Sequence, residues 1–275
     1  MLVTIDGRRI GYDDSGGLGT PLVLLHGFPL DRGVWDEQLP ALAGERVIRV
    51  DLRGCGESEP SDGPALMEML AADVAGVLDA LQVERVALAG HSIGGYVALA
   101  FFRMFAERVA GLALVAGHVA EDAGANPNAA PAQRVLAAAR EGQARRLEAE
   151  GTMDAAIESY LPRYFAPRVY RERPDLVERA RAMMARQDPG GCAQLVRGMQ
   201  QRLDSHDLLE DIGVPALVIA GGADSYLDAG TLRATAVAIR GAEFVLLEDV
   251  GHLPQWEAPR RTADALAAFA QRVDG

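Results

Sequence analysis

Short apolar runs alternate with helix-like segments along most of this chain. The runs are rich in β-branched residues and are bounded by Gly or polar residues, so they are predicted to be buried strands: residues 21–27, 46–54, 85–92, 109–117, 214–224 and 242–252. Residues 66–82 carry apolar side chains at three- and four-residue spacing, which predicts an amphipathic helix. Because strands that alternate with helices form a parallel sheet with right-handed crossovers, the order predicts an α/β fold with a mostly parallel, doubly wound sheet.

The two ends of the chain add one hairpin and one helix to this prediction. The segments MLVTI and RRIGYDD flank the Asp-Gly pair at residues 6 and 7, and they predict an antiparallel hairpin at one edge of the sheet. Residues 260–273 are predicted to close the chain as a helix. A chain of 275 residues is long enough for one large α/β domain that carries an insertion, so two independent domains are not required.

The alternation stops between residues 118 and 211. No strand is predicted there, and the segments PAQRVLAAAREGQARRLEAEG and ERARAMMARQ are rich in Ala, Arg and Glu, which favours helices. A linker to a separate domain would be expected to show more Gly, Ser or Pro. We therefore expect a core made of residues 1–117 and 212–275, with a helical insertion at residues 118–211.

The net charge argues against one class of partner. The chain carries 39 Asp and Glu residues against 27 basic residues, a formal charge of −12, and every basic side chain other than His is Arg. Nucleic-acid binding needs clustered Lys and Arg side chains near the phosphates, so no nucleic-acid partner is expected.

The apolar content and the cysteines predict a location. No window approaches the roughly 20 apolar residues of a membrane span, and residues 1–14 lack the basic and apolar regions of a signal peptide. Cys55 and Cys192 are too few and too far apart in the sequence for a disulfide framework, and neither has the neighbours of a metal site. These features predict a cytoplasmic protein with no membrane partner and no metal.

The segment Gly90-His91-Ser92-Ile93-Gly94 separates a predicted strand from a predicted helix. Its Ser92 has two interpretations. A Ser just before a helix can cap it, because the hydroxyl can accept a hydrogen bond from an unpaired backbone N–H. The pattern G-x-S-x-G between a strand and a helix can also form a sharp turn that projects a nucleophilic Ser above the sheet. The second interpretation requires a base and a group that orients the base.

A candidate base and a candidate acid occur at the ends of the last two predicted strands. His252 ends the last one, and Asp224 ends the one before it. Because functional groups gather at the carboxyl ends of parallel strands, Ser92, Asp224 and His252 are predicted to meet there as nucleophile, orienting acid and base. Asp228 is predicted to cap a helix that begins near Ala229, which leaves Asp224 for His252.

The segment HGFP at residues 26–29 follows the strand-like run PLVLL. On its own, it would be a turn at the end of a strand. Attack by a Ser on a carbonyl group creates an oxyanion, which needs two preorganised donors, commonly backbone N–H groups. The N–H groups of Phe28 and Ile93 are the predicted oxyanion hole.

Taken together, these residues resemble the α/β-hydrolase family, which uses the chain order Ser, Asp, His. The resemblance covers residues 8–272. DLRGCGES at residues 51–58 resembles the family turn Asp-x-Arg-Gly-x-Gly-x-Ser, and GHLPQWEAP at residues 251–259 resembles the segment of the catalytic His. The insertion at residues 118–211 corresponds to the variable α-helical cap of that family. Within the family, the chain is most similar to serine carboxylesterases and enol-lactone hydrolases.

The resemblance implies a serine hydrolase that cleaves carboxylic esters or lactones of small neutral substrates through an acyl-enzyme, without a cofactor. Two alternatives remain: a cofactor-free haloperoxidase or perhydrolase with the same triad, and a non-catalytic protein that binds a ligand on the same fold. The protein is expected to be a monomer or a homodimer. Candidate pocket residues are Phe28, Leu30, His118, Met153, Tyr160, Tyr164 and Phe165.

Two positions depart from the family pattern. The loop after Asp224 reads SYLDAG, where many relatives have a Pro within a few residues. Cys55 stands where a bulkier ring is common, and it is expected to fill space near the pocket.

Overall fold

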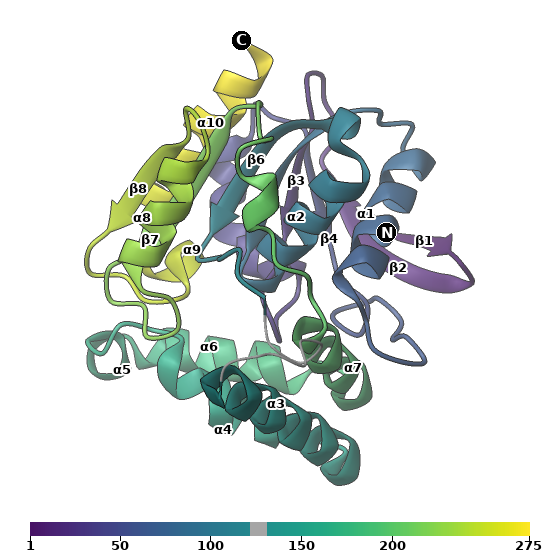
Figure 1. The fold of residues 1–275 in the computed structure, drawn as a ribbon, viewed down its shortest axis with the longest axis vertical. Coiled ribbons are helices and arrows are strands. Elements are labelled where there is room, and N and C mark those ends of the chain that lie inside the picture. The colour runs from purple at the N-terminus through teal and green to yellow at the C-terminus, as the bar shows by residue number, and fades with distance from the viewer. Residues whose placement is uncertain (122–130) are drawn as a thin grey trace.

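The structure is a computed structural model that describes residues 1–121 and 131–275. Its centre is an eight-stranded sheet with the order β1-β2-β4-β3-β5-β6-β7-β8 (Figure 1). The pairs β1/β2 and β2/β4 are antiparallel, and all other neighbours are parallel. The mostly parallel sheet predicted from the sequence is confirmed. The strands are β1 Leu2–Ile5, β2 Arg8–Asp14, β3 Leu22–Leu25, β4 Val47–Val50, β5 Val86–His91, β6 Val109–Val115, β7 Ala216–Gly221 and β8 Glu243–Leu247.

Every predicted strand is present; β2 has the predicted bounds, and each of the others is shorter than predicted. All residues of β3, β5, β6 and β7 are buried, as expected of strands that are covered on both faces. The residues that were predicted to belong to strands but lie outside them are mainly Gly and polar residues. They lie in the loops that follow or precede the strands. These loops carry the candidate functional side chains.

The N-terminal hairpin is also confirmed. Strand β1 pairs with β2 so that Ile5 faces Arg8 across the turn. Asp6 and Gly7 form this turn with φ angles of 47° and 75°. Positive φ at both central residues is what a two-residue turn of type I′ requires, and Asp-Gly is one of its preferred pairs.

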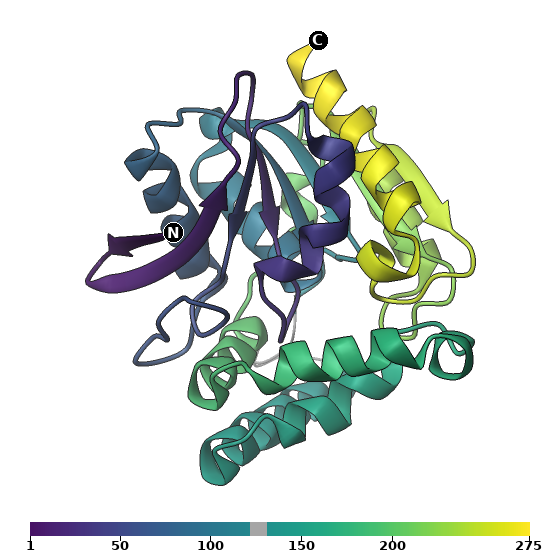
Figure 2. The same ribbon diagram turned by 180° about the vertical axis from the view of Figure 1, so that it is seen from behind.

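Helices cover both faces of the sheet. Helices α1 (Met67–Ala80), α2 (Ile93–Met104) and α8 (Ala229–Ala238) lie on the face that is in front in Figure 1. Helices η1 (Arg32–Leu42) and α10 (Pro259–Asp274) lie on the opposite face, which is in front in Figure 2. The sheet is therefore doubly wound, as predicted. Three short helices lie in the connections: η2 Ala106–Arg108, η5 His206–Leu208 and α9 Pro254–Glu257.

A second group of helices lies along one edge of the sheet, at the bottom of Figures 1 and 2. All of these helices come from the predicted insertion: α3 Pro131–Glu150, α4 Asp154–Tyr160, η4 Leu161–Arg163, α5 Val169–Glu172, α6 Pro174–Ala185 and α7 Pro189–Gln200. Within the described part of residues 118–211 there is no strand, in agreement with the sequence. Residues 122–130 of the insertion lie outside the described residues.

The helices of this group contact the sheet domain through close backbone packing. A Cβ atom placed on Gly54 would lie 2.6 Å from the Cα of Gly191, at the start of α7. Arg186 pairs with Asp31, which is on the loop after β3. No helix in the described ranges is both long and apolar enough to cross a membrane.

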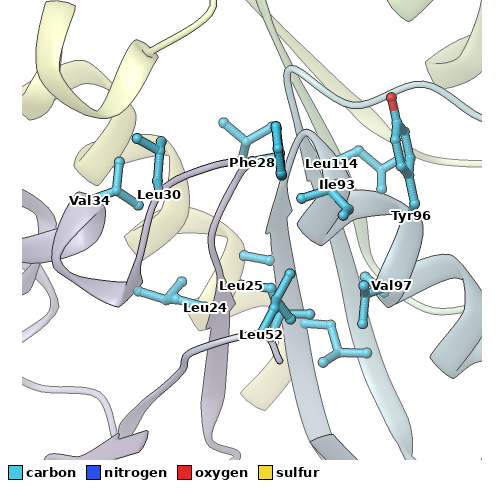
Figure 3. Packing of buried hydrophobic residues seen from close by; sticks show 14 of the residues in the cluster. Leu24, Leu25, Phe28, Leu30, Val34, Leu52, Ile93, Tyr96, Val97 and Leu114 are labelled. Atoms are coloured by element: carbon cyan, nitrogen blue, oxygen red, sulfur yellow. The ribbon is translucent and has the colours of Figure 1, made fainter. Parts of the chain in front are cut away.

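The hydrophobic core lies between the sheet and its helices. In Figure 3, Phe28 and Leu30 come from the loop after β3, whereas Ile93 and Val97 come from α2. All four side chains are buried. The loop after β3 and the start of α2, which are predicted to supply the oxyanion hole, are therefore anchored by apolar side chains.

Candidate active site

Ser92 lies in the sharp connection between β5 and α2. Its backbone has φ 52° and ψ −115°, a conformation that is rare for residues other than Gly. The Ser92 N–H donates a hydrogen bond to the Val115 carbonyl at 3.0 Å, which fixes the turn to the end of β6. The Ser92 side chain makes no capping hydrogen bond to α2 in the described chain. The capping interpretation of this Ser therefore has no support in the structure.

Two glycines permit this turn because no side chain fits at their positions. A Cβ atom on Gly90 would lie 2.2 Å from the carbonyl carbon of Gly94. A Cβ atom on Gly94 would lie 2.5 Å from the carbonyl oxygen of Leu25, at the end of β3. The two glycines of the G-x-S-x-G pattern thus allow the turn to close and α2 to approach the sheet.

We expect the substitution Gly94→Ala to lower the free energy of unfolding by about 1–3 kcal/mol or more, because the added methyl group must displace backbone rather than a flexible side chain. Gly142→Ala is the matched control, since Gly142 lies in α3 and a Cβ atom there has no neighbour within 4 Å. That control should raise the free energy of unfolding by about 0.5–1 kcal/mol. Urea unfolding measures both, and a Gly94→Ala protein as stable as wild type would contradict the close approach.

Asp224 and His252 form a buried pair at the ends of β7 and β8. The Nδ1 of His252 lies 2.7 Å from Oδ2 of Asp224, and both side chains are almost inaccessible to solvent. Oδ1 of Asp224 accepts hydrogen bonds from the N–H groups of Tyr226 at 2.7 Å and Leu227 at 3.2 Å. Burial raises the pKa of Asp224, but attraction to His252 and these hydrogen bonds outweigh it, so the pKa lies below its usual value.

This pairing sets the tautomer of His252. A carboxylate only accepts hydrogen bonds, so the proton of the neutral imidazole is on Nδ1 and Nε2 is left as the basic atom. The His252 backbone is held at both ends: its N–H donates to the Tyr164 carbonyl at 2.9 Å, and its carbonyl lies 2.8 Å from Nε2 of His91. The ring orientation of His252 is therefore fixed by the fold.

Asp228 caps α8, as predicted. Its carboxylate accepts a hydrogen bond from the Thr231 N–H at 2.9 Å. Asp228 is thus engaged at a helix N-terminus, whereas Asp224, four residues earlier, is the acid that contacts His252.

The two residues predicted to form the oxyanion hole, Phe28 and Ile93, lie on neighbouring elements of the fold. Phe28 follows β3 and Ile93 begins α2, and β3 is paired with β5. Neither N–H donates a hydrogen bond to any residue of the described ranges. The Phe28 carbonyl accepts a hydrogen bond from the Tyr164 hydroxyl, which fixes the peptide plane after Phe28. Both N–H groups therefore have no partner within the described ranges.

Ser92 and His252 line one cavity of about 420 Å³. Four of the predicted pocket residues also line it: Phe28, His118, Tyr160 and Tyr164. The remaining lining residues were not predicted: Tyr96, Glu121, Leu136, Ala139, Arg140, Gln143, Ser159, Arg163, Met199, Ser225, Tyr226 and Leu227.

Three predicted pocket residues lie elsewhere. Leu30, Met153 and Phe165 are buried in the hydrophobic core and are not part of the cavity wall. The Leu30 N–H donates to the Gly27 carbonyl at 3.0 Å, and the resulting turn carries the Leu30 side chain into the core. For these three side chains, the prediction of a pocket position is wrong.

Tyr226 lines the cavity beside His252, although its position there was not predicted from the sequence. Its ring centroid lies 4.9 Å from that of His252, and the Arg163 guanidinium lies over the Tyr226 ring at 4.3 Å. Tyr226 could have been predicted as a cavity residue, because it follows Asp224 by two residues in the same loop at the end of β7. Arg140 and Met199 gave no such signal, because they reach the cavity only through the packing of α3 and α7.

Cys55 and Cys192 are closer in space than their sequence separation suggests. Both side chains are buried, and neither cysteine forms a disulfide. The Sγ of Cys192 lies 3.9 Å from the Gly54 carbonyl, and the Cys192 thiol together with burial raises the pKa of the Cys55 thiol. Cys55 is not part of the cavity wall, and it packs beside Cys192 at the contact with α7. No cluster of three or more metal-ligating side chains occurs in the described ranges.

His91 and His118 are two further buried imidazoles. Burial and the nearby His252 lower the pKa of His91 to about 3, and burial with the charges of Arg202 and Arg140 lowers the pKa of His118 to about 3. Neither is therefore a general base near neutral pH. His91 packs against the loop after β3, since a Cβ atom on Gly27 would lie 2.3 Å from its Nδ1.

The low pKa values of these two imidazoles predict that the protein loses stability in acid. Below pH 6.5 the unfolded chain binds a proton at each His, whereas the folded chain does so only near pH 3. We expect each of the two His residues to lower the free energy of unfolding by about 2 kcal/mol between pH 7 and pH 5. Urea unfolding at both pH values measures the change, and in His118→Asn the contribution of about 2 kcal/mol from His118 should be missing. The same substitution at the exposed His206 is the control, and an equal effect of both would contradict this account.

The chain is similar to known proteins in both sequence and structure. The sequence profile described as "Alpha/beta hydrolase family" matches residues 22–265. A thermophilic esterase from Thermogutta terrifontis has a similar structure, with a TM-score of 0.90 at 35% identity, covering 100% of this chain and 97% of that one. The enol-lactonase from Burkholderia xenovorans LB400 has a TM-score of 0.86 at 28% identity, covering 98% and 100%.

A curated relative is similar in sequence over nearly the whole chain. The dihydrolipoyllysine-residue acetyltransferase component of the acetoin cleaving system from Pseudomonas putida is 32% identical over 274 residues, which are 98% of this chain and 68% of that protein. The profile match spans most of the chain, including both strand loops that carry Asp224 and His252. The chain belongs to the alpha/beta hydrolase family.

Proposed function

We propose that this protein is a serine hydrolase that cleaves carboxylic esters or lactones of small neutral substrates through an acyl-enzyme intermediate. One observation supports this most: Ser92, in a strained turn, lines the same cavity as the His252 that is paired with Asp224. A cavity of about 420 Å³ suits a small ligand. The similarity to an esterase and to an enol-lactonase supports the same reaction class.

In the proposed reaction, Nε2 of His252 takes the Ser92 proton while Oγ forms a bond to the substrate carbonyl carbon. Asp224 stabilises the imidazolium that results and keeps its own ionisation state. The imidazolium then gives that proton to the leaving oxygen as the C–O bond breaks, which leaves the acyl group on Ser92. Water attacks the acyl group next, with His252 again accepting and returning the proton, and the carboxylic acid departs.

The oxyanion is assigned to the N–H groups of Phe28 and Ile93. Both are backbone donors whose positions are fixed before substrate binds, so they need no reorganisation during the reaction. The N-terminus of α2, which begins at Ile93, adds a favourable dipole. Loss of one such donor typically costs about 10²- to 10³-fold in rate.

We also propose that residues 118–211 act as a cap on a core formed by residues 1–117 and 212–275. Several side chains from this cap line the cavity, with His118, Tyr160 and Tyr164 among them. Phe28, from the core, contacts Tyr160 edge to face at 5.2 Å between ring centroids. The cap and the loop after β3, which carries Phe28, are thus expected to select the substrate together.

A panel of p-nitrophenyl esters and lactones tests this function. The account predicts saturable hydrolysis of members with short chains by the wild-type protein. A parallel arm with acetate and hydrogen peroxide tests the perhydrolase alternative, which would give faster peracid formation than ester hydrolysis. Absence of turnover with every ester and lactone would contradict the proposal and favour a ligand-binding protein.

A further inference from the structure

His118 lies beside the nucleophile because it follows the strand next to β5. The Ser92 N–H donates to the Val115 carbonyl, and a Cβ atom on Gly117 would lie 3.5 Å from the Ser92 carbonyl oxygen. His118 is the next residue, and it lines the same cavity as Ser92. In the sheet order, β6 is on the opposite side of β5 from β3, so His118 and Phe28 flank Ser92 from opposite sides.

Arg202 determines which nitrogen of His118 carries the proton. Nη2 of Arg202 lies 3.0 Å from Nε2 of His118. A guanidinium group has only donors, so Nε2 must accept and the proton of the neutral ring is on Nδ1. Arg202 is itself held by a hydrogen bond from its Nε to the Ala120 carbonyl at 3.0 Å and by its position 4.0 Å over the Tyr96 ring.

The Nδ1–H of His118 is a donor that the protein does not use. In the ranges that the structure describes, Nδ1 makes no hydrogen bond, and it is not among the buried polar atoms that lack a partner, so it is accessible from outside the protein. The Tyr96 ring contacts the imidazole edge to face at 5.3 Å, which limits rotation of the ring. Burial and the positive charges of Arg202 and Arg140 lower the pKa of His118 to about 3, so the ring keeps one proton at neutral pH.

We propose that His118 Nδ1–H donates a hydrogen bond to an oxygen of the substrate other than the oxygens of the reacting ester group. The enzyme would then prefer oxygenated esters and lactones, such as those with a ketone or ether oxygen, over hydrocarbon analogues of the same shape. A site built to donate to an oxygen disfavours the analogue that lacks it, because binding of that analogue covers the donor and leaves it without a partner. This inference rests on the proposed ester or lactone hydrolysis.

Matched pairs of substrates test the preference. On the acyl side, p-nitrophenyl 4-oxopentanoate is compared with p-nitrophenyl 4-methylpentanoate. On the alcohol side, 2-methoxyethyl butanoate is compared with butyl butanoate. Each pair keeps the number of heavy atoms and replaces one carbon group by an oxygen acceptor. We expect the wild-type protein to favour the oxygenated member of at least one pair by about three- to tenfold in kcat/KM.

Variants at His118 identify the source of the preference. His118→Phe keeps a ring and removes the donor, so the ratio within the pair should fall to that of the uncatalysed reactions. His118→Asn places an amide N–H near the position of Nδ1 and should restore part of the ratio. His206→Asn, at an exposed position, is the control and should leave the ratio unchanged. A ratio of two substrates in one sample does not depend on how much of the variant is folded.

The outcomes separate this inference from the proposed function. Equal rates within both pairs for the wild type, or a preference that persists in His118→Phe, would overturn the role of His118 while leaving ester hydrolysis intact. Absence of hydrolysis of all four esters, or hydrolysis that persists in Ser92→Ala, would overturn the proposed function and the inference with it.

Discussion

Replacing Ser92 with Ala is expected to lower kcat/KM for ester hydrolysis by about 10⁴- to 10⁶-fold. The substitution removes the only protein atom that bonds to the substrate carbon in the proposed reaction, and in a Ser triad loss of the nucleophile removes nearly all the benefit of the other members. The residual rate would come from binding and from the N–H groups of Phe28 and Ile93. Initial rates at several substrate concentrations measure the loss.

The same variant distinguishes a nucleophile from a helix cap. A capping Ser replaced by Ala typically costs about 0.5–2 kcal/mol of stability. Because the Ser92 side chain makes no capping hydrogen bond to α2, we expect Ser92→Ala to unfold within about 0.5 kcal/mol of the wild type. A protein that loses stability but retains activity would support the cap and contradict the nucleophile.

Asp224→Asn is expected to lower kcat by about 10⁴-fold with little change in KM. An Asn side chain can donate to Nδ1 of His252, which favours the tautomer with its proton on Nε2, and that tautomer cannot accept the Ser92 proton. The loss thus arises from the wrong proton position and not from a missing contact. Steady-state kinetics measure kcat and KM separately, and circular dichroism checks that the fold is kept.

Asp228→Asn is the matched control for this prediction. It makes the same chemical change four residues away, in the loop that follows β7. Asp228 caps α8 through the Thr231 N–H, and Asn caps helices about as well as Asp does. Both activity and stability should therefore stay close to wild type. Equal losses in the two variants would mean that Asp224 has no special relation to His252.

The parts of the fold that could be predicted are those that local patterns encode. Buried strands read as apolar runs, and the Asp-Gly pair at residues 6 and 7 has the φ angles that its turn type demands. Ser92, Asp224 and His252 could be placed because each follows a strand, and the carboxyl ends of parallel strands lie at one edge of the sheet. Chain topology thus brought residues that are far apart in sequence into one site.

The parts that could not be predicted depend on the geometry of single turns and on how the helices at residues 131–200 pack on the sheet. Leu30 and Phe28 are two residues apart in one loop, yet only Phe28 reaches the cavity, because the turn at Gly27 directs Leu30 into the core. The proximity of Cys55 to Cys192 likewise follows from the contact between Gly54 and α7. Such contacts have no periodic signature in the sequence.

The partner of His118 shows the same limit. His118 was among the predicted pocket residues, but its tautomer depends on Arg202, which is 84 residues further along the chain. Only the folded chain joins the two, and only then does the free Nδ1–H become a candidate donor.

Covalent labelling with an organophosphate identifies the nucleophile of this protein. The protein is treated with diethyl p-nitrophenyl phosphate, and the released p-nitrophenolate, the remaining esterase activity and the mass of each peptide are measured together. The account predicts one equivalent of p-nitrophenolate, loss of activity in proportion to labelling, and a diethyl phosphoryl group on the peptide that contains Ser92. Full activity in a protein labelled at Ser92, or inactivation with the label on a different residue, would contradict the assignment of Ser92 as the nucleophile.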